Sequence, residues 1–306
     1  MNNSGLRGVI AAAATPLTAD LQPDLDRFVA LCGWLLDNGC DGLNICGTTG
    51  EATSFTRGQR MAIMSAAAAS LPCDRMMVGT GAASVGDALA LTEHAAALGF
   101  AGALLLPPFY YKGVEDDGIL RYFERIAAAT ASEPIELYLY NFPALSGVLY
   151  SPGLVRRLRE AFGGRIAGLK DSSGDLAYAT EVAAISPDLR VFPSNEAVLL
   201  RARAGDFAGC ISASANVNAP FCARAFHDGD GEALEIATKI RALVSRTKLI
   251  PSIKASLASI RRDPAFEAVL PPLTELSPDE RSALLRDLQP LQSRATPSRS
   301  AAALAG

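Results

Sequence analysis

The chain has 306 residues, of which 49% are hydrophobic and 20% are charged, and its formal net charge is -4. This composition is typical of a soluble globular protein with ample material for a core. The small negative charge and the lack of a basic run argue against a nucleic-acid partner, and no apolar stretch of about 18 residues predicts a membrane span.

Apolar runs that read as strands alternate with amphipathic segments that read as helices. The predicted strands cover residues 8–14, 41–46, 76–80, 102–106, 135–140, 166–170, 189–192 and 207–212, and the helices cover 24–38, 57–71, 85–98, 117–130, 152–162, 176–185, 196–204 and 220–227. Eight such units fit a closed (β/α)₈ barrel better than an open doubly wound sheet. No G-x-G-x-x-G opens the first helix, which also argues against a dinucleotide fold.

The strand-helix alternation stops near residue 230, so we divide the chain into three parts. Residues 1–230 form the barrel that carries the active site, and residues 231–292 form C-terminal helices, expected at 232–248, 251–260 and 277–288. Residues 293–306 are rich in alanine and serine, show no apolar periodicity, and are predicted to be a mobile tail.

The six cysteines form no close C-x-x-C pair, so the sequence gives no support for a zinc site. Free thiols suit a reducing compartment. The first five residues lack the charged and apolar regions of a signal peptide. We therefore expect a cytoplasmic protein without a metal.

Lys170 stands at the end of an apolar strand, directly before the turn-forming cluster Asp171–Gly174. An amine that is partly enclosed by apolar neighbours is less easily charged, and a neutral amine is the nucleophile of Schiff-base chemistry. The alternative interpretation is a lysine that extends from a strand end into solvent. Taken by itself, that alternative is the commoner case.

In a barrel, catalytic groups lie at the carboxyl ends of the strands. The polar and aromatic residues expected there are Thr48, Thr49, Tyr110, Tyr111, Tyr140, Asn141, Lys170, Ser194, Asn195, Glu196 and Ser212. The turn Gly47–Glu51 offers backbone N–H groups and two hydroxyls to an anion, although it can also be an ordinary turn. Alternation directs Tyr138 and Tyr140 to the same face, which we expect to be the inward one. There Tyr140 can relay protons or simply fill the barrel.

Three motifs occur together in this chain: Gly-Thr-Thr-Gly-Glu at 47–51, Tyr-Asn-Phe-Pro at 140–143 and Gly-Leu-Lys-Asp-Ser-Ser-Gly-Asp at 168–175. The combination resembles the dihydrodipicolinate synthase/N-acetylneuraminate lyase family of Schiff-base (β/α)₈ enzymes. The resemblance extends over about residues 8–290. It implies a lyase in which a lysine imine serves as the electron sink and no metal or organic cofactor takes part.

The resemblance also implies a role for each matching position. Lys170 corresponds to the lysine that condenses with pyruvate or another 2-oxo acid, and Tyr140 to the general acid/base. Thr48 and Thr49 correspond to the carboxylate-binding pair, with Thr48 also in the proton relay. Tyr111 corresponds to a tyrosine that enters the neighbouring subunit's site, which implies a tetramer built as a dimer of dimers. The expected substrate-binding residues are Gly47, Thr48, Thr49, Leu145, Ser172, Ser194, Glu196 and Ser212.

The subfamily stays open at this point. Leu145 occupies the position where dihydrodipicolinate synthases carry an arginine, and leucine cannot form that residue's bidentate contact with a carboxylate. Asn195 replaces an acidic residue of the sialic acid lyases, whereas Asp171–Gly174 resembles the 2-keto-3-deoxy sugar-acid aldolases. We expect an aldolase or lyase that joins or separates pyruvate and an aldehyde. The alternatives are a dehydratase or deaminase with the same imine, dihydrodipicolinate synthase itself, and an inactive family member that serves as a binding protein.

Overall fold

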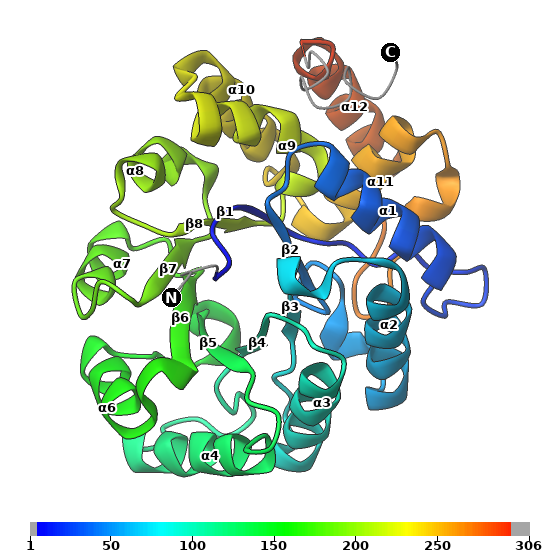
Figure 1. Cartoon of the computed structure of the whole chain (residues 1–306). Helices are drawn as coiled ribbons and strands as arrows, with labels where there is room; N and C mark the ends of the chain where they lie inside the picture. Colours follow the sequence, from blue (N-terminus) through cyan, green and yellow to red (C-terminus); the bar gives the residue numbers. More distant parts are fainter. Residues whose placement is uncertain (1–4, 295–306) are drawn as a thin grey trace.

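Eight parallel strands form one sheet in the computed structural model, which describes residues 5–294 (Figure 1). The strands are β1 (Gly8–Ala12), β2 (Gly42–Ile45), β3 (Met76–Gly79), β4 (Gly102–Leu105), β5 (Glu136–Asn141), β6 (Ile166–Asp171), β7 (Arg190–Pro193) and β8 (Gly209–Ser212). Their order is β7-β6-β5-β4-β3-β2-β1-β8, so each strand lies beside its neighbour in sequence and β1 lies beside β8.

The two ends of this sheet meet between β7 and β8. The backbone N–H of Ala208, just before β8, donates a hydrogen bond to the carbonyl of Val191 in β7 at 2.9 Å. The sheet therefore curves into a barrel, and the predicted (β/α)₈ fold is confirmed (Figure 1).

Side chains alternate between the inside and the outside of the barrel. On β5, Leu137 and Leu139 belong to the apolar layer between strands and helices, whereas Tyr138 and Tyr140 belong to a second apolar cluster inside the barrel. The inward direction expected for both tyrosines is thus confirmed. Burial on both faces explains why the strands read as nearly continuous apolar runs.

Helices surround the barrel in the order that the sequence predicts. They are α1 (Leu25–Asp37), α2 (Arg57–Ser70), α3 (Val85–Ala97), α4 (Asp116–Ala129), α6 (Pro152–Phe162), α7 (Leu176–Ala183), α8 (Leu199–Ala204) and α9 (Ala215–Ala223). A short helix that the sequence did not predict, α5 (Pro143–Ser146), follows β5. Among residues 5–294, no helix combines the length and the apolar character that crossing a bilayer requires.

The predicted start of the last barrel helix at Pro220 was wrong, because α9 begins at Ala215. The segment before the proline reads as a polar loop, but its asparagines have distant partners. Asn216 donates to the carbonyl of Ala12 at 2.7 Å, and Asn218 donates to the carbonyl of Ala237 at 3.0 Å. These tertiary hydrogen bonds stabilise helical residues that local sequence does not favour.

Three further helices follow the barrel: α10 (Gly231–Val244), α11 (Leu249–Arg261) and α12 (Pro278–Gln292). They lie on one side of the molecule, beside α9 and α1 (Figure 1). A capping box opens α12, since the side chain of Ser277 accepts from the backbone N–H of Glu280 and the side chain of Glu280 accepts from the backbone N–H of Ser277. The predicted tail at 293–306 lies almost entirely outside the described residues.

Candidate active site

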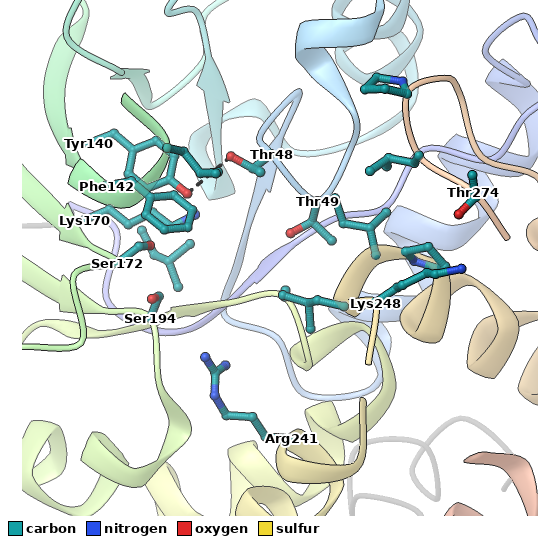
Figure 2. Close-up of a pocket in the computed structure, with 18 residues that line it drawn as sticks. Thr48, Thr49, Tyr140, Phe142, Lys170, Ser172, Ser194, Arg241, Lys248 and Thr274 are labelled. Carbon is teal, nitrogen blue, oxygen red and sulfur yellow. Dashed lines mark hydrogen bonds between the residues drawn. The ribbon is translucent and has the colours of Figure 1, made fainter. Parts of the chain in front are cut away.

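A cavity of about 560 Å³ opens at the carboxyl ends of the strands (Figure 2). Its walls come from both the barrel and the C-terminal helices. The lining residues are Thr48, Thr49, Tyr140, Phe142, Leu145, Lys170, Ser172, Ser194, Ile211, Ala213, Arg241, Lys248, Leu249, Ile250, Pro251, Pro272, Leu273 and Thr274. Seven of the residues predicted for the site therefore share this one cavity: Thr48, Thr49, Tyr140, Leu145, Lys170, Ser172 and Ser194.

Lys170 is buried, with 3% of its surface exposed, and it pairs in register with Tyr140 on β5. A β-bulge directs its side chain inward. Ile166 and Gly168 pair with the consecutive residues Leu137 and Tyr138, so that β6 carries one additional residue at this point. Without the bulge, strict alternation from the outward-facing Ile166 would turn Lys170 toward the helices.

Gly168 is required where the bulge meets the interior. A β-carbon at this position would lie 2.3 Å from the carbonyl oxygen of Arg190 and 2.7 Å from ring atoms of Tyr138. Such contacts are too short for any side chain. The glycine in the motif Gly168–Asp175 thus permits the strand geometry that presents the lysine.

The Tyr140 ring lies beside the Lys170 amine. The Nζ atom lies 4.3 Å from the centroid of the tyrosine ring, and the phenol oxygen is 3.3 Å from Oγ1 of Thr48. Burial opposes ionisation of the phenol, but the charge of Lys170 and hydrogen bonds from Thr48, Ser172 and Lys170 outweigh it. Together they lower the pKa of Tyr140 below its ordinary value. The phenol is thus prepared to exchange a proton near the amine.

The turn that carries Thr48 and Thr49 is held by hydrogen bonds to distant parts of the chain. The hydroxyl of Thr15 donates to the carbonyl of Gly50 at 2.9 Å. Glu51, whose φ is 56°, accepts from Nζ of Lys254 on α11 at 2.5 Å and from the backbone N–H of Leu270 at 2.6 Å. Helix α11 and the segment that follows it therefore fix the loop that carries Thr48 and Thr49.

Gly47 precedes the threonines but does not line the cavity. A β-carbon here would lie 2.6 Å from Oδ1 of Asn44, a buried residue on β2. Its contribution is the close approach of the turn to β2 rather than a contact in the cavity.

Asp171 holds the loop after β6. Its carboxylate accepts from Nδ2 of Asn141 at 2.8 Å and from the hydroxyl of Ser173 at 2.9 Å. This arrangement leaves the neighbouring Ser172 on the cavity wall with Ser194 (Figure 2).

Glu196 and Ser212, like Gly47, were expected to bind substrate but do not line the cavity. Glu196 is fully buried in the turn Glu196–Val198, and the hydroxyl of Ser212 donates to its Oε1 at 2.8 Å. The same carboxylate accepts from Ser214 and Asn218, and from Nη1 of Arg241 at 3.1 Å. Both residues thus belong to a buried hydrogen-bond network behind the wall.

Tyr111 lies apart from the cavity. Its side chain is 72% exposed and packs edge-on against Tyr110, with ring centroids 5.3 Å apart. Within this chain it contributes nothing to the walls around Lys170.

Sequence reasoning missed the wall formed by the C-terminal part of the chain. Arg241 on α10, Leu249–Pro251 on α11 and Pro272–Thr274 all border the cavity. None of them follows a strand, so the strand-end rule could not find them. No local signal distinguishes Arg241 from other arginines on helices.

Comparison with known proteins places this site in a family. The model of the dihydrodipicolinate synthetase family matches residues 5–291. The chain belongs to this family. It is 33% identical over 298 residues to an uncharacterized DapA-like lyase of Chloroflexus aurantiacus, which covers 95% of this chain and 99% of that protein. It is 32% identical over 267 residues to a 4-hydroxy-tetrahydrodipicolinate synthase of Moorella thermoacetica, covering 85% of this chain and 86% of the relative.

Solved structures of family members have the same fold. The dihydrodipicolinate synthase of Agrobacterium tumefaciens superposes with a TM-score of 0.86 at 29% identity, covering 93% of this chain and 99% of that one. A prophage protein of the family from E. coli, solved in complex with pyruvate, superposes with a TM-score of 0.84 at 27% identity, covering 94% and 98% of the two chains. The chain is therefore a lyase of the dihydrodipicolinate synthetase family, as its sequence motifs indicated.

Proposed function

We propose that this family lyase acts on pyruvate and an aldehyde through an imine on Lys170, in the manner of a class I aldolase. The observation that carries the proposal is the pairing of the buried Lys170 amine with the Tyr140 phenol inside an open cavity. The turn with Thr48 and Thr49 borders the same cavity and offers hydroxyl and backbone donors to the carboxylate of a 2-oxo acid. The pyruvate complex of the E. coli relative supports this choice of substrate.

The chemistry begins with attack of the Lys170 amine on C2 of the 2-oxo acid. Loss of water from the carbinolamine gives a protonated imine. In the cleavage direction, the C4 hydroxyl loses its proton and the electrons of the C3–C4 bond move into the imine. An aldehyde and an enamine result. Protonation of the enamine at C3 and hydrolysis of the imine then release pyruvate and the free amine.

Tyr140 moves the protons in these steps, and Thr48 passes them on. The phenol oxygen of Tyr140 and the hydroxyl oxygen of Thr48 are 3.3 Å apart, within hydrogen-bonding distance. The lowered pKa of Tyr140 brings the phenol closer to the range in which it can both donate and accept a proton. The scheme takes its acids and bases from the residues of this chain.

Trapping of the imine tests the proposal. Incubation with pyruvate and borohydride should reduce the imine, add a stable three-carbon adduct to Lys170 and abolish turnover. Lys170→Ala should accept no adduct, whereas Lys248→Ala, which removes another lysine from the cavity wall, should still be labelled at Lys170. An adduct found on Lys112, Lys239, Lys248 or Lys254 instead, or none at all, would refute the mechanism.

The second candidate function is 4-hydroxy-tetrahydrodipicolinate synthase, because curated relatives at 29–33% identity carry that name. The position of Leu145 weighs against it. This residue is 61% exposed on the cavity wall and offers no donor to the carboxylate of aspartate semialdehyde. A dehydratase or deaminase would use the same imine, and a screen of 2-oxo acids for pyruvate release separates these reactions.

We further propose that the working unit is a homotetramer, a dimer of dimers in which Tyr111 serves a neighbouring site. Tyr110 and Tyr111 are large, exposed aromatic side chains of the kind that anchor interfaces.

The six cysteines are free thiols, which suits our expectation of a reducing cytoplasm.

A further inference from the structure

The cavity wall carries three cations and, among the described residues, no carboxylate. The cations are Lys170, Arg241 and Lys248. Imine formation occupies Lys170, so the other two determine which substrate groups the rest of the cavity attracts.

Arg241 is held rigidly with one side of its guanidinium turned to the interior network. Nη1 donates to Glu196 at 3.1 Å, to Ser212 at 3.0 Å and to Ser214 at 3.3 Å. Within residues 5–294, no hydrogen bond involves its Nε or Nη2. Figure 2 shows the side chain reaching from α10 toward the part of the cavity that holds Ser194.

Glu196 pairs with Arg241 at 3.1 Å and balances much of its charge, but the carboxylate does not line the cavity. It lies behind the wall, and its oxygens already accept from Ser212, Ser214, Asn218 and Arg241. A substrate hydroxyl would have to displace one of these buried donors to reach it. The exposed side of the pair is therefore the guanidinium, which donates hydrogen bonds and accepts none.

Lys248 contributes less at this wall. Its Nζ donates to the carbonyl of Glu275 at 3.0 Å and lies 3.9 Å from Oε2 of Glu280, and the side chain is half exposed. Its charge is thus directed to other groups and screened by solvent.

Resting on the proposed function, we infer that the substrate is a 2-oxo acid with a second anionic group at its far end, and that the Nε–Nη2 edge of Arg241 binds that group. A planar guanidinium edge forms two parallel hydrogen bonds with a carboxylate or a phosphate. Leu145, Leu249 and Ile250 border the cavity as well and suit a hydrocarbon segment between the two charged ends. Arg241 thereby supplies the cation that Leu145 does not.

A competition between 2-oxo acids tests this inference. The enzyme is offered equimolar pairs that differ in the far-end charge: 2-oxoglutarate with 2-oxopentanoate, and 2-oxoadipate with 2-oxohexanoate. Borohydride traps the imines, and the masses of the labelled protein give the ratio of the two adducts. A third pair, 2-keto-3-deoxy-6-phosphogluconate with its dephosphorylated form, is compared by calorimetry on Lys170→Ala protein, because an active enzyme would cleave both to the same pyruvate adduct. This pair reports binding of a phosphate.

Protein with Arg241 intact should prefer the anionic member of at least one pair, by roughly ten- to hundredfold for a charge-assisted contact. Arg241→Gln should abolish that preference. Because this change leaves Glu196 buried without its cation, the double variant Arg241→Gln/Glu196→Gln removes both charges and should behave alike. The matched control is Arg246→Gln, since Arg246 pairs with Asp287 outside the cavity, and it should keep the preference.

A preference that survives in both Arg241 variants, or that is missing from all three pairs while Arg241 is intact, would overturn the inference. Its failure is distinguishable from failure of the imine mechanism. Calorimetry with 2-oxoglutarate and 2-oxopentanoate on Lys170→Ala protein measures binding where no imine can form. If Lys170→Ala protein binds 2-oxoglutarate more tightly and Arg241→Gln abolishes this preference, the anion site is supported whether or not Lys170 forms an imine. Equal affinities for 2-oxoglutarate and 2-oxopentanoate refute the anion site.

Discussion

The Nζ atom of Lys170 lies 4.3 Å from the centroid of the Tyr140 ring, on adjacent strands and in the same register. This placement makes the amine and the phenol one electrostatic unit. The charge of Lys170 favours ionisation of the phenol, and the hydroxyl of Thr48 shares a hydrogen bond with the phenol at 3.3 Å. Proton transfer at the imine therefore has a short route within the described side chains.

Replacing Tyr140 by phenylalanine should lower kcat by roughly 10²- to 10⁴-fold, the usual contribution of a general acid/base. The ring remains to fill the barrel, so the loss reports the hydroxyl alone. Steady-state kinetics of pyruvate release measure it. Tyr122→Phe is the matched control, because the buried Tyr122 hydroxyl on α4 has no hydrogen-bond partner among residues 5–294. Equal activity of the two variants would exclude Tyr140 from proton transfer.

The pH dependence of kcat/KM should reflect the environment of Tyr140. Where the phenol must donate a proton, activity falls as pH rises through its pKa, which lies below the ordinary value of about 10. Thr48→Val removes a hydrogen bond that lowers this pKa and should move the alkaline limb to higher pH. Thr49→Val should weaken substrate binding without moving that limb. A limb unchanged by Thr48→Val would show that another group titrates.

Leu145→Arg should raise the condensation of pyruvate with aspartate semialdehyde, which we expect to be slow in the wild-type protein. A charge-assisted contact contributes about 1.5–3 kcal/mol, or roughly ten- to hundredfold in kcat/KM. Leu149→Arg adds the same charge at an exposed leucine that does not line the cavity and should have little effect. Rapid condensation by the unmodified enzyme would contradict the expectation.

Subunit mixing tests whether Tyr111 serves a neighbouring site. Tyr111→Phe and Lys170→Ala proteins should each be nearly inactive. A hybrid dimer combines both lesions in one site and leaves the other intact, so random exchange should restore roughly a quarter of wild-type activity. The experiment requires folded parents and hybrids verified by mass. Verified hybrids without activity would mean that Tyr111 acts within its own chain or not at all.

The buried ion pair between Glu51 and Lys254 should be essential for stability. Both side chains are fully buried, and Lys254→Met would leave a carboxylate without its cation, at a cost of about 3–5 kcal/mol in the free energy of unfolding. Glu51→Gln/Lys254→Met should recover part of that loss. Lys239→Met removes an exposed pair with Glu235 and should change stability by about 1 kcal/mol or less. Denaturant titrations measure the free energy of unfolding of the three variants. Similar losses of stability in Lys254→Met and Lys239→Met would show that the buried pair is no more important than an exposed one.

The sequence by itself determined the barrel and the centre of the site. Apolar runs bounded by turn residues mark all eight strands, because a strand buried on both faces must be apolar along its length. The carboxyl ends of parallel strands share one rim, so Thr48, Tyr140 and Lys170 could be grouped from their positions alone. These inferences depend only on local pattern and on the geometry of parallel sheets.

The tertiary structure decided what faces the substrate. Three features of the site depend on contacts between residues far apart in the chain. A bulge in β6 turns Lys170 inward, Glu196 lies in a buried hydrogen-bond network, and Arg241 reaches the cavity from α10. Glu196 stands at a strand end, as the pattern required, yet its carboxylate finds four donors behind the wall. Burial of a charge is tolerated only where such partners are present, and their positions are fixed by packing rather than by local sequence.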